Sequence, residues 1–191
     1  MKRIKRVLYI FIACILVIIV AGFIYLAYEQ IESRKVPQRS ADFFYEHKSM
    51  LEDFVDLCLD NKISFIDKVD REDRDELKYN ISKYYIYAYQ ELSAQTQQKF
   101  EEILSVFIEN NISDIFVWTY QEGELAERMK YSLSIHFSWG SGWADLLYTD
   151  EYVSNVEELL EYEFEEQAQH LDQEHWVLLY DINDKRVVTK K

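Results

Sequence analysis

The chain has 191 residues, of which 49% are hydrophobic and 16% aromatic, and its 35 acidic side chains outnumber 21 lysines and arginines. A composition this apolar favours a folded protein over a disordered one. The net charge of −14 disfavours binding to nucleic acid and to anionic lipid headgroups, because like charges repel.

Residues 7–28 form an uncharged apolar run that predicts a transmembrane helix. As an α-helix the run would be roughly 33 Å long, which is enough to cross a hydrocarbon core about 30 Å thick. Tyr9, Tyr25 and Tyr28 lie near its two ends, and such amphipathic rings favour the membrane–water interface. We therefore expect residues 7–28 to hold the chain in a lipid bilayer.

A cleaved signal peptide is the alternative interpretation of this run. Signal peptides have apolar cores of about 7 to 15 residues that end in a small-x-small cleavage site. Here the core is longer, and its far end, Tyr25-Leu26-Ala27, has a tyrosine where a small residue is required. The sequence therefore favours an uncleaved signal-anchor.

The cations on either side of the run indicate its orientation. Residues 1–6 contain four of them, whereas Arg34, Lys35 and Arg39 follow the run. Because basic flanking residues favour the cytoplasmic side, we expect a basic cytoplasmic N-terminus over residues 1–6 and an extracytoplasmic domain. The chain would then be a single-pass protein of the cell membrane.

The remainder divides into a short linker and one domain. Residues 29–39 are polar and contain the only proline, Pro37, which is expected to end the membrane helix. Residues 40–191 have the length of a single domain. Without the four N-terminal cations, residues 29–191 carry 17 lysines and arginines against 35 acids, a net charge of −18.

Four helices are expected in this domain, because apolar residues recur at helical spacing. Ser40 and Ser93 are candidate N-caps for two of them. One helix is ambiguous, because Tyr85, Tyr87 and Tyr89 alternate as in a strand, but its polar residues fall at helical spacing and favour a helix. The four expected ranges are 40–60, 73–92, 93–109 and 153–168.

Strands are expected where β-branched and aromatic residues alternate or cluster. Residues 130–138 alternate apolar and polar side chains, and residues 139–143 have the composition of a hairpin turn with a return strand to Tyr148. Helices, then strands, then a helix and strands predict an α+β domain with about four helices packed on an antiparallel sheet. The other expected strands are residues 115–121, residues 176–180 and the pair Val187–Val188.

No catalytic or metal-binding motif is found. Only four glycines exist, and neither G-x-G-x-x-G nor G-x-x-x-x-G-K can be written with them. His170 and His175 are five residues apart, whereas the zinc-protease motif needs four. Ser141 lies between glycines but does not meet the G-x-S-x-G pattern of hydrolases. We therefore predict no metal, no cofactor and no enzymatic activity.

Two features remain as candidate binding surfaces. One is the aromatic hairpin, with Trp139, Trp143 and Tyr148 and with His136 on the neighbouring strand. Tryptophan and tyrosine are favoured anchors of protein interfaces, although these rings could equally cover the open end of the sheet. The other is the acidic side of the 153–168 helix, which could meet a basic partner or be an ordinary solvated face. Its residues are Glu158, Glu161 and Glu165.

The layout of a basic start, one anchor and a small acidic α+β domain resembles that of many bacterial envelope proteins and of some immunity proteins of toxin systems. No motif identifies one family. The first hypothesis is therefore a membrane-anchored binding domain that captures a basic or envelope protein partner. The second is a structural or accessory subunit that assembles through its membrane helix, and the third is an enzyme with an unrecognised site.

Overall fold

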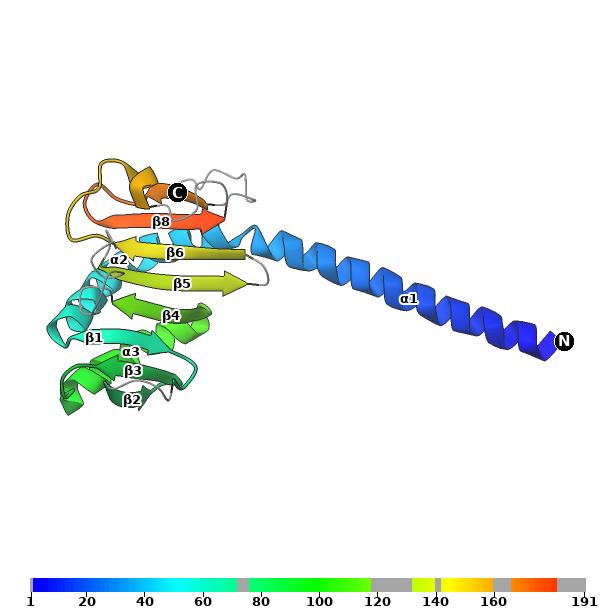
Figure 1. Ribbon diagram of the computed structural model, residues 1–191, viewed down its shortest axis with the longest axis horizontal. Coiled ribbons are helices and arrows are strands. Elements are labelled where there is room, and N and C mark those ends of the chain that lie inside the picture. Colours follow the sequence, from blue (N-terminus) through cyan, green and yellow to red (C-terminus); the bar gives the residue numbers. More distant parts are fainter. Residues whose placement is uncertain (1, 72–75, 118–131, 140–141, 160–165, 182–191) are drawn as a thin grey trace.

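The computed structural model describes residues 2–71, 76–117, 132–139, 142–159 and 166–181 (Figure 1). It has a long N-terminal helix, two further α-helices, one short 3-10 helix and eight strands in these ranges. The helices are α1 (Lys2–Ser33), α2 (Val36–Asp60), α3 (Ala94–Glu109) and η2 (Val156–Leu159). The strands are β1 (Ile63–Asp67), β2 (Leu77–Ile81), β3 (Tyr84–Ala88), β4 (Ile112–Val117), β5 (Leu133–Trp139), β6 (Gly142–Tyr148), β7 (Glu166–His170) and β8 (Trp176–Asp181).

The eight strands form one antiparallel sheet in the order β2-β3-β1-β4-β5-β6-β8-β7. Helices α2 and α3 cover one face of it, and the main core lies between them and the sheet (Figure 1). On α2, for example, Phe54 packs edge-on against Phe100 and Phe107 of α3, with ring centroids 6.2 and 5.0 Å apart. The α+β class is confirmed, but the described part of the domain has two α-helices and η2 rather than four helices.

The predicted helix over residues 73–92 is wrong, because β2 and β3 form a hairpin there. Ser82 and Lys83 make its two-residue turn with φ of 48° and 69°, the left-handed pair that matches the twist of a hairpin. Tyr84 and Ile86 face the helices, whereas Tyr87 packs on Phe65 on the opposite face. The tyrosine alternation was the correct signal, because each face of the hairpin is buried by a different neighbour.

The predicted helix over residues 153–168 is also wrong. Residues 156–159 form only the short helix η2, and β7 begins at Glu166 and pairs with β8. Val153, Val156 and Leu159 pack with Leu147 and other apolar residues on the sheet face away from α2. The apolar spacing of this segment therefore reflects a loop folded over the sheet. The predicted strand pair Val187–Val188 lies outside the described residues.

Helix α1 is long and apolar enough to cross a membrane. Its described side chains from Cys14 to Tyr28 are exposed, and Figure 1 shows the helix projecting away from the domain. It continues through residues 29–33, so only Arg34 and Lys35 separate it from α2. Pro37 lies in the first turn of α2, where its missing N–H costs nothing.

The last turn of α1 is packed against the start of β6. A β-carbon on Gly142 would lie 2.3 Å from the carbonyl oxygen of Ser33, so only glycine permits this approach. Glu32, whose side chain is 10% exposed, accepts hydrogen bonds from Lys35 at 2.6 Å and from Arg39 at 2.5 Å. These bonds lower the pKa of Glu32 and join the end of α1 to α2.

Asp172 organises the turn that leads into β8. Its Oδ1 accepts hydrogen bonds from the backbone N–H groups of Glu174, His175 and Trp176 at 2.9–3.0 Å, and its Oδ2 lies 2.9 Å from Nζ of Lys48 on α2. Burial of Asp172 opposes its charge, but these four interactions outweigh burial and lower its pKa to about 2.

The variant Asp172→Asn should lower the free energy of unfolding by about 2 kcal/mol at pH 7, since it loses the contact with Lys48 and the charge on the turn. A lowered folded pKa contributes stability above the unfolded value, near 4, and this contribution is lost as the pH falls towards about 2. Urea unfolding of the full chain in neutral detergent, from pH 7 to pH 3, measures the loss of stability in the variant and its dependence on pH. If the free energies of unfolding of wild type and variant differed equally at pH 7 and pH 3, the lowered pKa of Asp172 would be contradicted.

Candidate functional site

A groove of about 410 Å³ lies between α2 and α3. The apolar stripes of both helices turn inwards, with Phe54 on α2 and Phe100 on α3 fully buried. The opposite side of each helix therefore lines the groove. Its lining residues are Asp53, Asp56, Leu57 and Asp60 from α2, and Lys99, Glu102 and Ile103 from α3.

The groove carries four carboxylates and one ammonium group. Asp53, Asp56 and Asp60 follow one another at spacings of three and four, which places them in a row along α2. All three are exposed, so water and salt screen them and each ion pair with a ligand would contribute about 0.2–1 kcal/mol. Leu57 and Ile103 are half-buried and supply apolar surface between the charges. Lysine and arginine side chains, which have an aliphatic part and a cationic end, fit such a surface.

The aromatic residues predicted as one binding surface lie on different parts of the sheet. Tyr148 ends β6 on the helix-covered face, with its ring 5.3 Å from that of Trp176. Trp143, near the other end of β6, is half-buried against the apolar cluster on the opposite face. Trp139 ends β5, and its side chain lies outside the described residues. Tyr148 is therefore separated from the two tryptophans.

Of the glutamates predicted to form an acidic helix face, only Glu158 lies in a described element, the 3-10 helix η2, and its side chain is outside the described residues. Glu161 and Glu165 lie outside them altogether. The acidic surface that the described residues do form is on α2 and α3.

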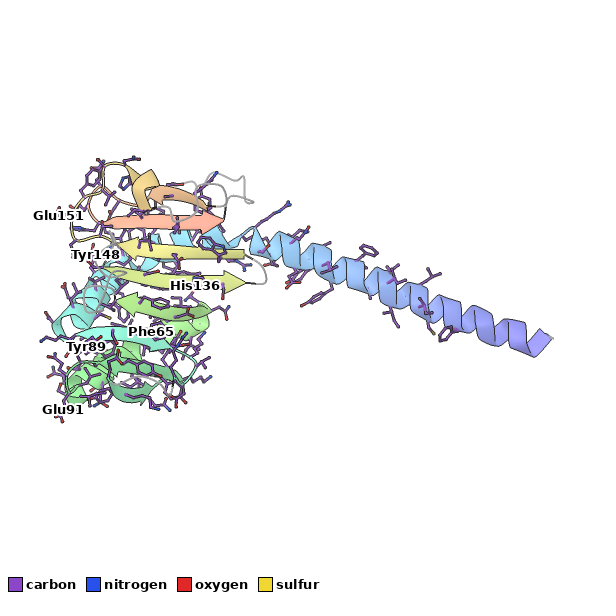
Figure 2. All side chains as sticks on the ribbon, in the orientation of Figure 1. Phe65, Tyr89, Glu91, His136, Tyr148 and Glu151 are labelled. Carbon is purple, nitrogen blue, oxygen red and sulfur yellow. The ribbon has the colours of Figure 1, made fainter. Side chains whose placement is uncertain are left out.

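His136 belongs to a row of polar side chains across the face of the sheet opposite α2 and α3. Its Nδ1 lies 2.8 Å from Oδ1 of Asp145 on β6. On the other side, the strand register aligns Asp67 with Asp114, next to His136. Asp67 is buried and accepts a hydrogen bond from Nε of Arg71 at 2.7 Å. Figure 2 labels His136 near the middle of the sheet.

The row places the imidazole of His136 between the carboxylates of Asp145 and Asp114. Burial opposes the charge on His136, but the hydrogen bond and charge of Asp145, together with the charge of Asp114, outweigh it and raise the pKa of His136. No arrangement of three or more histidine, cysteine or acidic side chains suited to a metal is found among the described residues. We therefore interpret the contact of His136 with Asp145 as a structural contact between β5 and β6 whose strength depends on pH.

Sequence reasoning found His136 but not its partners. The alternation of residues 130–138 placed His136 on the polar face of a strand, whereas Asp145 and Asp114 become its neighbours only through strand pairing. The acidic groove was missed for the same reason, because its two walls are separate helices. The row Asp53, Asp56 and Asp60, opposite the apolar stripe of α2, was the available signal.

Comparison with known proteins gives no further assignment. No protein-family model, no curated protein and no solved structure matches the chain.

The variant His136→Gln should destabilise the chain more at pH 6 than at pH 9. A raised folded pKa contributes stability below the unfolded value, near 6.5, and this contribution is lost as the pH rises through the folded pKa. The expected difference at pH 6 is on the order of 1 kcal/mol. Urea unfolding at both pH values measures it, with Ser138→Ala on the same strand as the control. A destabilisation that does not change with pH would contradict the charged pair.

Proposed function

We propose that this chain is a single-pass membrane protein whose extracytoplasmic domain captures a basic segment of a protein partner in the groove between α2 and α3. The observation that carries the proposal is the row of Asp53, Asp56 and Asp60 beside Glu102, with apolar surface from Leu57 between them. This groove replaces the 153–168 segment as the acidic binding surface.

The packing of α1 supports an uncleaved anchor. Glu32 and Ser33 are buried against the domain, and Glu32 bridges to Lys35 and Arg39. Cleavage within the apolar run would leave a short apolar stub attached to this packed turn. The four cations of residues 1–6 favour a cytoplasmic N-terminus, which would expose the domain on the outer side.

The location of the groove favours a partner that arrives from solution. Helix α2 starts beside the end of α1 and has 25 residues with a kink at His47, so its C-terminal turn is at most roughly 35 Å from its first residue. Asp53, Asp56 and Asp60 lie in its last third, and Figure 1 shows this end of α2 on the side of the domain away from α1. A partner could therefore reach the groove without contacting the bilayer.

The double variant Asp53→Lys, Asp56→Lys should weaken binding of a fluorescein-labelled peptide rich in lysine and arginine by roughly tenfold, because attraction becomes repulsion at two positions. Fluorescence anisotropy with the full chain in neutral detergent measures the affinity, and rising salt should reduce it for the wild type.

The matched control is Glu46→Lys, Glu101→Lys, which makes the same change of charge at exposed positions of the same helices, outside the groove lining. It should weaken binding much less. If both double variants lost the same affinity for the peptide, binding would depend on the net charge of the domain, and the groove would not be the binding site. Capture of envelope and secreted proteins of the native host by wild type, compared with the groove variant, would then identify the partner.

An accessory subunit that assembles through α1 is the second candidate. The observation in its favour is the apolar surface of α1 from Cys14 to Tyr28, which is exposed. Replacing residues 7–28 with an unrelated apolar helix should leave peptide capture and cellular function intact if α1 is a tether. Loss of function with unchanged capture would favour the accessory subunit.

A further inference from the structure

We propose that the strand ends on the side of the sheet beside α1, called this edge below, bind the headgroups of anionic phospholipids through Lys68 and Lys83. This contact would hold the domain against the bilayer. This inference rests on the proposed role of α1 as a membrane anchor. It adds a second contact with the membrane, made by the domain itself.

The antiparallel pairing defines which edge faces the membrane. Ser33, at the end of α1, packs on Gly142, the first residue of β6. The registers then bring the end of β5, the start of β4 and the end of β1 to this same edge. The β2–β3 turn lies there as well, because β3 begins opposite the end of β1. Figure 1 shows these strand ends on the side from which α1 emerges.

The continuous helix keeps this edge close to the lipid. The uncharged run ends at Tyr28, and Ser33 is five residues further along α1, a rise of about 8 Å. The headgroup layer of a bilayer adds roughly 5–8 Å on each side of the hydrocarbon core. With α1 spanning the membrane, its docked end therefore lies at the level of the headgroups.

Two lysines are presented at this edge. Lys68 follows the last residue of β1, and Lys83 lies in the β2–β3 turn; both are exposed. Nζ of Lys68 lies over the ring of Tyr84, 5.5 Å from its centroid. Partial burial lowers the pKa of Lys68, the charge of Asp114 opposes this effect, and the charge of Lys83 contributes a smaller lowering. Both side chains therefore lie at the same end of the strands, where a lipid phosphate would meet two cations.

The junction between α1 and α2 adds further positive charge to this side of the domain. Arg34 is exposed between α1 and α2, and Lys35 with Arg39 outweighs the single charge of Glu32. Acidic residues on this side reduce the positive charge: Glu29 lies near the end of α1, Glu109 ends α3, and Asp70 and Asp114 lie near Lys68.

The net charge of the domain opposes its approach to anionic lipid, but that charge is unevenly placed. The acidic groove lies at the other end of α2. At physiological ionic strength the Debye length is about 8 Å, so groups at the near edge dominate the interaction with headgroups. Each lysine close to an anionic surface contributes roughly a fivefold factor to binding.

The test uses the full chain with Cys14 and Cys58 replaced by serine and a nitroxide attached at Val69→Cys, beside Lys68. A second sample has the nitroxide at Glu91→Cys, an exposed position that Figure 2 labels at the end of the sheet away from α1. Both are reconstituted in phosphatidylcholine vesicles and in vesicles with about a third phosphatidylglycerol. Collisions of each nitroxide with a nickel chelate on the lipid headgroups are measured.

The expected result is frequent collision at Val69 in the anionic vesicles, a several-fold decrease in Lys68→Gln, Lys83→Gln, and infrequent collision at Glu91 throughout. The matched control, Lys62→Gln, removes an exposed lysine at the opposite end of β1, outside the groove lining, and should change nothing. Lys62 and Lys83 both have left-handed backbones, so conformational effects of the substitutions are matched.

Two outcomes would overturn the proposal while the anchor stands. One is equal collision at Val69 in the two kinds of vesicle, and the other is no effect of Lys68→Gln, Lys83→Gln. A chain that does not float with vesicles in a density gradient would overturn the anchor as well as this inference. A single Lys83→Gln variant, in a two-residue turn with both side chains outside the core, covers the case in which the double variant misfolds.

Discussion

A β-carbon on Gly142 would lie 2.3 Å from the carbonyl oxygen of Ser33, and the absence of that atom lets the last turn of α1 rest on the first residue of β6. The bridge from Glu32 to Lys35 and Arg39 then fixes the direction in which α2 leaves. From this junction α2 runs across the sheet, and the sheet edge beside Gly142 becomes the edge nearest the membrane helix. The orientation of the whole domain relative to α1 depends on this contact.

This geometry separates the charges of the domain along α2. The acidic groove lies at the end of α2 away from α1, whereas Lys68 and Lys83 lie at the sheet edge beside α1. A strongly acidic protein can therefore present basic groups to lipid and acidic groups to a soluble partner. The polar row around His136 lies on the face of the sheet opposite α2, where the carboxylate of Asp145 favours the charged form of the imidazole and raises its pKa.

Much of the fold could be predicted from local patterns. The apolar run of α1, the α3 cap at Ser93, which accepts a hydrogen bond from the N–H of Thr96 at 3.1 Å, and the β5–β6 hairpin are local features. Helix α2 was predicted too, although it begins at Val36 and not at Ser40, whose hydroxyl bonds to the carbonyl of Val36 inside the helix. The β2–β3 hairpin and β7 were missed because their periodicity fits two structures, and only pairing with β1 and β8 decides between them. The groove needs two helices to be side by side, which no local pattern contains.

The central claim is that the domain is docked on α1 and does not hang from a flexible linker. Spin labels at Ile24 on α1 and at Gln98 on α3, both exposed, would test it by double electron–electron resonance in lipid vesicles, with Cys14 and Cys58 replaced by serine. The account predicts one narrow distance distribution, which should broaden when a short glycine–serine insertion is placed between Lys35 and Val36. A broad distribution in the chain without the insertion would contradict the account.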